Sequence, residues 1–445
     1  MSGEALGMIM LAILLVAILI GFPTAFTLMS LGVTFGFLGI GFLVFDLVVQ
    51  RTFFVMQNDV LVAIPLFLLM GYIVERAGIL DRLFLSVQLV MGGVPGAIGV
   101  ATLVTGTLFA TATGIVGASV TLLGLLAMPA MMRRGYNGSF SAGIIVAAGT
   151  LGILVPPSVL LILYGFVAGV SVPRLYAAAF FPGLMLAGFY ALYIMVRAVR
   201  NPALAPPLPL SERNVSMPRI LFMLLTGMLP ITSLIVFVLG AIFFGFATPS
   251  EGAALGALGG FILAAGYRRL TFKMLKEVLF LTVRASAMVG WLLVGSSIFA
   301  AVFARLGSAT LVGDFLIGIG LDQLQFVILV QILIFLLGWP LEWTEITIIF
   351  LPLFLPLLLV YEVDLVWFGV LAAMNMQTAF LSPPVAMSAY YLMNVVPRGI
   401  TLNQIFKGMY PYIGIQVFAI VILYVFPGLA LWLPGVIYDA PFAAQ

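Results

Sequence analysis

Two acidic side chains, Glu342 and Glu345, lie within a long apolar segment that runs from Leu324 to Val360. A carboxylate inside the hydrocarbon region of a membrane is costly unless it is paired or coordinated, so such a residue marks a functional site by default. We therefore predict a functional role for Glu342, and for Glu345 we favour one of the structural alternatives. The alternatives are a structural pair with an interfacial arginine and exposure to a water-filled vestibule.

A second group of polar residues lies in a segment rich in glycine, alanine, threonine and serine. Thr111-Ala112-Thr113-Gly114 and the nearby Ser119 offer hydroxyl groups, and small residues leave main-chain carbonyls accessible. Hard cations such as Na⁺ prefer oxygen ligands of this kind. The segment therefore favours an ion site at the tip of a re-entrant hairpin, and the alternative is close helix packing through small residues.

Paired prolines interrupt two further apolar segments at corresponding places. Pro156-Pro157 and Pro383-Pro384 are offset by the same distance, to within one residue, as Pro23 and Pro249. Proline removes an amide donor and frees the carbonyl one turn earlier, and at membrane depth such carbonyls persist only when buried, wetted or ion-bound. Interrupted helices at matching positions in two halves are typical of transporters built from inverted repeats. The small and polar residues beside the two breaks are Gly149, Thr150 and Ser158 in the first half, and Asn375, Gln377, Thr378 and Ser382 in the second.

The composition excludes most other classes of protein. The 445 residues are 64% hydrophobic and 7% charged, which predicts an all-α polytopic membrane protein. The absence of Cys and His removes disulfides, thiolate or imidazole metal sites and Ser-His triads. No phosphate-binding glycine-rich loop is present, and the small positive charge indicates membrane topology rather than nucleic-acid binding. The N-terminal segment lacks the basic residues of a cleaved signal, so we expect its helix to be retained.

We divide the chain into two inverted repeats, residues 1–200 and 219–445, joined by a proline-rich cytoplasmic linker at 201–218. Each repeat should hold about five crossings, one re-entrant hairpin and one proline-broken helix. The hairpins are expected at about 97–132 and 324–360, and the broken helices at about 139–170 and 365–396. In the first half we expect a helix that ends near Phe45 and a mixed stretch from Asp46 to Asp59. In the second half we expect a span that begins near Thr282.

The distribution of charge predicts the orientation in the membrane. If both termini are periplasmic, every Lys and Arg except Arg51, Arg174 and Arg305 falls on the cytoplasmic side, as the positive-inside rule requires. The basic stretch from Arg268 to Lys276 is then an anchor in contact with anionic lipid.

These motifs together resemble the large membrane subunit, the DctM-like permease, of tripartite ATP-independent periplasmic (TRAP) transporters. The resemblance covers nearly the whole chain. It rests on three segments: Ala247-Thr248-Pro249-Ser250-Glu251-Gly252-Ala253-Ala254, the run from Gly149 to Ser158, and Leu381-Ser382-Pro383-Pro384-Val385.

The resemblance implies Na⁺-coupled uptake of a small organic acid across the bacterial inner membrane by an elevator mechanism. Two hairpins and two broken helices would slide against a scaffold made by the other helices. The implied partners are a small four-helix Q-type subunit, a periplasmic substrate-binding protein and the lipid bilayer, with no role for nucleic acid. It also implies a transporter rather than an enzyme.

Ion and substrate sites follow from the same resemblance. The first ion site would use Thr111, Thr113, Gly114, Ser119, Gly149 and Thr150. The second would use Gly338, Glu342, Thr344, Gln377, Thr378 and Ser382. We expect the substrate to contact Thr113, Ser119, Pro156, Ser158, Asn375, Ser382 and Pro383. One departure is that Glu342 stands where the family often has an aspartate, within the bulky run Trp339-Pro340-Leu341-Glu342-Trp343.

Other readings stay open at this point. A stand-alone carboxylate symporter or exchanger of the same broad fold would need no binding protein. A channel would conduct without saturation. An intramembrane protease is disfavoured, because a metalloprotease needs histidine ligands and every aspartate here lies at a predicted interface.

Overall fold

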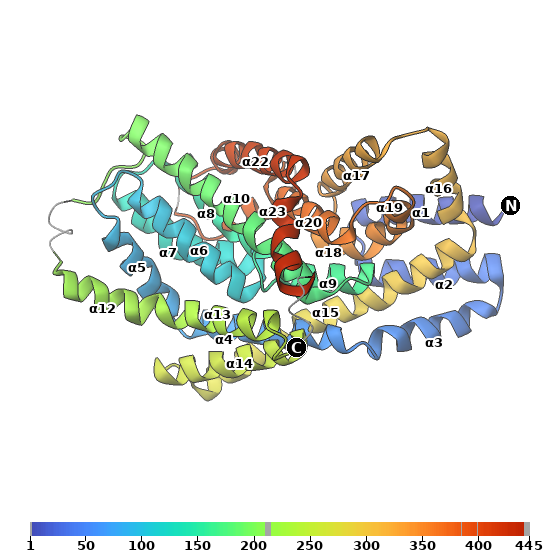
Figure 1. Cartoon of the computed structure of the whole chain (residues 1–445), viewed down its shortest axis with the longest axis horizontal. Helices are drawn as coiled ribbons and strands as arrows, with labels where there is room; N and C mark the ends of the chain where they lie inside the picture. The colour runs from blue at the N-terminus through green and yellow to red at the C-terminus, as the bar shows by residue number, and fades with distance from the viewer. Residues whose placement is uncertain (1, 210–214, 384, 398, 440–445) are drawn as a thin grey trace.

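The computed structural model describes residues 2–209, 215–383, 385–397 and 399–439. Across these residues the chain is helical and contains no β-strand, which confirms the all-α prediction (Figure 1). Six described helices are long and apolar enough to cross a membrane, or eight spans if each of two bent helix pairs is counted. Several other expected crossings are apolar helices of 10–17 residues. The protein is therefore a multi-pass membrane protein.

The first half contains the helices up to residue 200, and the second half those from residue 217 onward. The first comprises α1 (Gly3–Ile20), α2 (Thr24–Ile40), α3 (Leu43–Met56), η1 (Asp59–Val62), α4 (Ala63–Arg76), α5 (Ile79–Val90), α6 (Ala97–Thr113), α7 (Val116–Arg133), α8 (Gly138–Thr150), η2 (Leu151–Ile153), α9 (Val159–Ala168) and α10 (Val172–Arg200). The second comprises α12 (Met217–Gly227), α13 (Leu229–Phe243), α14 (Pro249–Gly266), α15 (Phe272–Arg305), α16 (Ser308–Gly318), α17 (Gln323–Leu337), α18 (Trp343–Glu345), η3 (Ile346–Phe350), α19 (Leu351–Val360), α20 (Leu365–Leu381), α21 (Met387–Met393), α22 (Leu402–Val425), α23 (Gly428–Pro434) and η4 (Gly435–Asp439). Part of the predicted linker, residues 210–214, lies outside the described residues.

Each segment predicted as a hairpin or a broken helix is divided between separate helices, whereas its re-entrant course in a membrane stays a prediction. The first hairpin is α6 and α7, and the second is α17 followed by α18, η3 and α19. The first broken helix is α8 and α9, and the second is α20 and α21. Their order along the chain is the same in the two halves, whereas the opposite orientation of the halves in a membrane stays a prediction.

Three expectations about the scaffold were wrong in detail. The second helix ends at Ile40 rather than near Phe45, because Gly41 takes a left-handed φ of 65° and ends it. The stretch from Asp46 to Asp59 is largely helical, as α3, and pairs with η1 and α4 in a span bent by 56°. No separate span begins near Thr282, because α15 is one helix of 34 residues that includes the expected basic stretch from Phe272 onward.

The helices that follow Pro23 and Pro249 each pack on a long span of the other half. α2 lies along α15, and α14 lies along α4. The signature around Pro249 explains how α14 begins: the Glu251 carboxylate accepts the Thr248 amide at 2.8 Å, and the Thr248 hydroxyl accepts the Glu251 amide at 3.3 Å. This reciprocal capping satisfies donors that a helix start otherwise leaves unpaired. These motif residues therefore have a structural role in the scaffold.

Candidate functional site

The first hairpin turns at Gly114, whose φ of 63° favours glycine. Across the turn the hydroxyl oxygens of Thr113 and Ser119 lie 3.2 Å apart, and both side chains are buried. The Thr113 hydroxyl also donates to the Ala110 carbonyl at 3.4 Å, and the Ser119 hydroxyl to the Ile115 carbonyl at 2.9 Å. This first tip is therefore a neutral, buried cluster of hydroxyl and carbonyl oxygens, a donor set that fits a hard monovalent cation.

The first tip rests on the broken helix of its own half. A Cβ added at Gly114 would lie 3.2 Å from the side chain of Val159, the first residue of α9. A Cβ at Gly149 would lie 2.4 Å from Val120, so α8 and α7 touch closely just before the break. The Thr150 and Ser158 hydroxyls donate to the carbonyls of Ala147, at 2.9 Å, and of Ile153. Thr111 likewise donates to Thr107 within α6, at 2.7 Å.

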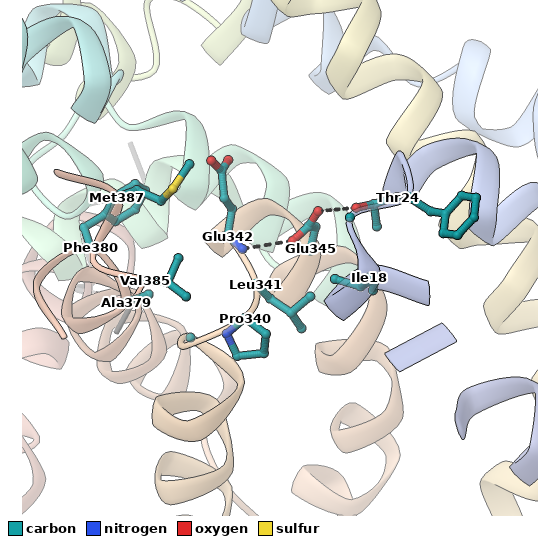
Figure 2. A pocket seen from close by; sticks show the side chains of 13 residues that line it. Ile18, Thr24, Pro340, Leu341, Glu342, Glu345, Ala379, Phe380, Val385 and Met387 are labelled. Carbon is teal, nitrogen blue, oxygen red and sulfur yellow. Dashed lines mark hydrogen bonds between the residues drawn. The ribbon is translucent and has the colours of Figure 1, made fainter. Parts of the chain in front are cut away.

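At the second tip, between α17 and α18, the Glu345 carboxylate accepts two hydrogen bonds. Glu345 accepts the main-chain N–H of Glu342 at 2.9 Å and the Thr24 hydroxyl at 2.5 Å (Figure 2). Thr24 is the first residue of α2, so Glu345 joins the second tip to the break between α1 and α2. A π-helical turn, η3, follows directly, and such turns often occur at functional sites.

A cavity of about 250 Å³ lies where this tip meets the second broken helix and the α1–α2 break. Figure 2 shows Glu342 and Glu345 at its wall, with their carboxylates directed apart. Among the described residues that line it there is no Lys or Arg. The lining residues are Ile18, Gly21, Phe22, Thr24, Gly338, Pro340, Leu341, Glu342, Glu345, Ala379, Phe380, Val385 and Met387.

The second broken helix touches the first hairpin through one aromatic side chain. A Cβ added at Gly117 on the first hairpin would lie 3.2 Å from the ring of Tyr391 on α21. The hairpin of one half therefore packs against the broken helix of the other half.

The polar residues of α20 face its neighbours rather than the cavity. Asn375 donates from its amide to the carbonyl and the side-chain oxygen of Gln331 on α17, at 2.7 and 2.8 Å. Gln377 accepts from the amide of Gln416 on α22 at 3.2 Å. The Thr378 hydroxyl donates to the Asn375 carbonyl at 2.6 Å. These contacts hold α20 between the hairpin and α22, one to two turns before its break.

Of the residues predicted as ion or substrate ligands, all of which are described, Gly338 and Glu342 line the cavity, together with the second acid of this segment, Glu345. Thr344 is buried beside them, and Ser382 ends α20 with its hydroxyl on the Thr378 carbonyl. Pro156 is buried in the first break and Pro383 lies in the turn after α20, whereas Pro384 falls outside the described residues. Ligand roles for all these residues stay predictions.

Thr24, Phe380 and Met387 also line the cavity, although none of them was predicted as a site residue from the sequence. For Thr24 a signal was present, because a proline followed by a small hydroxyl residue begins this helix. Nothing in the sequence pairs Thr24 with Glu345, which lies more than three hundred residues later.

Residues 11–429 match the sequence profile of the family described as "Tripartite ATP-independent periplasmic transporter, DctM component". The chain is similar to the C4-dicarboxylate TRAP transporter large permease protein DctM of Rhodobacter capsulatus, with 29% identity over 88% of this chain and 90% of that one. It is also similar to the sialic acid TRAP transporter large permease protein SiaM of Vibrio cholerae, with 28% identity over 93% and 95%.

Among solved structures, the YdaH transporter of Alcanivorax borkumensis superposes with a TM-score of 0.60. The identity is 18%, and the match covers 86% of this chain and 88% of that one, so the likeness concerns the fold alone. The relatives are transporter permeases, which are not enzymes. The profile match over nearly the whole chain, which carries the signature motifs, shows that this protein belongs to the DctM family of TRAP transporter large permeases.

Proposed function

We propose that this permease carries out Na⁺-coupled secondary active uptake of a small organic acid across the bacterial inner membrane. Its relatives are named for C4-dicarboxylates and sialic acid, which are both organic acids. The observation that carries the proposal is the cavity at the second tip, where a hairpin, a broken helix and the scaffold meet around two carboxylates.

The charge of this cavity favours a coupling cation. An anionic substrate cannot approach Glu342 and Glu345 favourably when no Lys or Arg of the described lining offsets their charge. A Na⁺ ion bound with the substrate would supply the missing positive charge, and the oxygens of the two tips are suitable ligands for it. Substrate affinity should therefore fall when Na⁺ is removed. An affinity that is the same with and without Na⁺ would contradict this coupling.

The remaining parts of the proposal follow from membership of the family. A small Q-type subunit would dock on the scaffold, and a periplasmic binding protein would deliver the substrate. The two hairpins and two broken helices would move together against the scaffold, with both chain termini on the periplasmic side.

The test is uptake by proteoliposomes that contain this chain and its small membrane partner, with and without the substrate-loaded binding protein. We expect uptake only when the binding protein is present. Uptake that is equally fast without it would favour the second candidate, a stand-alone carboxylate symporter of the same fold. The cavity is compatible with both candidates, because its lining is the same whichever way the substrate reaches the permease.

A further inference from the structure

A second hollow lies away from the transport site, where α5, the junction of α12 and α13, and the end of α14 come together. Its volume is about 430 Å³. A Cβ added at Gly227, the last residue of α12, would lie 2.9 Å from the main chain of Arg82 on α5, so these helices are in close contact. In Figure 1 α5 and α12 run side by side at the left of the view. The lining residues are Arg82, Leu225, Thr226, Pro230, Gly266, Tyr267 and Arg268.

Two arginines from different halves of the chain line this hollow. Arg82 places its guanidinium 5.1 Å from the centre of the Tyr267 ring, and the Tyr267 hydroxyl donates to the Thr226 carbonyl. Within the described part of the chain no carboxylate lines the hollow, and neither Arg82 nor Arg268 forms an ion pair. Guanidinium groups without acidic partners are suited to a phosphate group, which they bind through paired N–H donors.

The backbone at Arg268 adds a second argument. Arg268 has a φ of 55°, a left-handed conformation that glycine adopts readily and arginine does not. The turn is closed by hydrogen bonds from the Arg268 amide to Ala265 and from the Arg269 amide to Ala264, both 2.9 Å. A glycine would suit this helix end better, so the arginine side chain is present at some cost to local stability.

The surroundings of the hollow favour the phosphate group of a lipid over a soluble phosphate. Leu225, which lines the hollow, is exposed, and so are Leu270 and Phe272, which follow Arg268 within four residues along the chain. Phe272 is 84% exposed. Basic residues next to exposed apolar side chains at the end of membrane helices are typical of contacts with lipid headgroups. A soluble phosphate would not need the apolar surroundings.

We propose that this hollow is a binding site for the headgroup of an anionic phospholipid, with Arg82 and Arg268 on the phosphate and the exposed apolar residues beside the acyl chains. The lipid would join α5, which leads into the first hairpin, to the α12–α14 region of the scaffold. This site is independent of the transported substrate.

The test compares lipid retention by the full-length protein after purification from nanodiscs of phosphatidylcholine with and without phosphatidylglycerol, measured by native mass spectrometry. The variants are Arg82→Gln, Arg268→Gly and the two combined. Lys407→Gln is the control, because Lys407 is an exposed cation on α22. We expect wild type and control to retain phosphatidylglycerol preferentially, and each arginine variant to lose about fivefold in affinity for it.

Arg268→Gly separates a loss of lipid binding from a loss caused by misfolding. It removes the charge while relieving the left-handed backbone, so in lipid-free detergent its melting temperature should equal or exceed that of wild type. Equal retention of the two lipids by wild type, or undiminished retention by the double variant, would overturn the proposal. Stabilisation by soluble phosphate as large as that by phosphatidylglycerol would overturn the lipid assignment.

Discussion

The two hairpin tips differ in charge, in burial and in what they touch. The first tip is neutral, turns within Gly114 and Ile115, and rests on the broken helix of its own half. The second tip spreads over residues 338–342, carries Glu342, is followed by Glu345 on α18, and faces a cavity bounded by the scaffold. Similar positions in the two halves have therefore become chemically different sites.

This difference suggests a division of roles. A neutral cluster of oxygens such as Thr113 and Ser119 can hold a cation without a carboxylate. It meets the scaffold through close packing, because a Cβ at Gly71 of α4 would lie 2.5 Å from the Cα of Thr113. The second tip is in direct contact with the scaffold through the bond between Thr24 and Glu345. Changes at the first tip should therefore act through packing and ion affinity, whereas changes at the second should also affect movement and substrate binding.

The largest expected effect on stability comes from disturbing the packing beneath the first tip. A Cβ at Gly152 would lie 2.3 Å from the Ala110 carbonyl oxygen, so Gly152→Ala must push α6 away from η2. We expect a loss of about 1–3 kcal/mol in stability, seen as a lower melting temperature in detergent. Gly188→Ala is the matched control, because a Cβ there meets nothing within 4 Å. Similar melting temperatures for the two variants would show that this packing is not tight.

Glu342→Gln should have the next largest effect. Removing one charged contact of about 1.5–3 kcal/mol should raise the Na⁺ concentration for half-maximal uptake by about tenfold or more. Glu342→Asp, which keeps the charge, should stay closer to wild type. Membrane insertion, followed by expression level, should be unchanged. A wild-type Na⁺ response in Glu342→Gln would assign this residue a structural role.

Breaking the bond between the second tip and the scaffold should have a smaller effect. Thr24→Val and Glu345→Gln should each alter the maximal uptake rate a few-fold, since the first removes and the second weakens the same contact, and the double variant should therefore add little. Thr24→Ser keeps the hydroxyl and serves as the control. Additive effects of the two single variants would mean that the contact does not operate as a pair.

The smallest effect is expected from Ser119→Ala at the neutral tip. A neutral hydrogen bond contributes about 0.5–1.5 kcal/mol, so the half-saturating Na⁺ concentration should rise a few-fold at most. Thr107→Val is the control, because the Thr107 hydroxyl donates to the Leu103 carbonyl at 2.7 Å within α6, about two turns before the tip. An effect of Ser119→Ala as large as that of Glu342→Gln would remove the proposed contrast between the tips.

Much of the fold could be predicted from the sequence because local residues determine it. Gly114 and the Pro156-Pro157 pair interrupt long apolar runs, and the helix breaks lie where these residues predict them. The hydroxyl-rich composition around Gly114 also indicated that Thr113 and Ser119 lie at the first tip, where their oxygens are 3.2 Å apart. The extent of α3 and α15 was not predictable in this way, because charges such as Lys273 and Lys276 indicated a basic stretch separate from the span, although both lie in the same helix as the span.

The long-range contacts of the site could not be predicted from the sequence. Gln377 and Asn375 are polar residues beside a break, yet their side chains bond to Gln416 and Gln331 on flanking helices. Which face of a uniformly apolar helix turns toward a neighbour is set by tertiary packing, and the apolar pattern of α20 gives no preferred face.

The most direct test of the proposed function is the dependence of uptake on the Na⁺ gradient. Proteoliposomes with this permease and its small membrane partner would receive a substrate-loaded binding protein under an inward Na⁺ gradient or an equal K⁺ gradient. We predict accumulation of the organic acid only with Na⁺, and its loss when an ionophore dissipates the gradient. Equal accumulation under the two gradients would contradict the Na⁺-coupled mechanism.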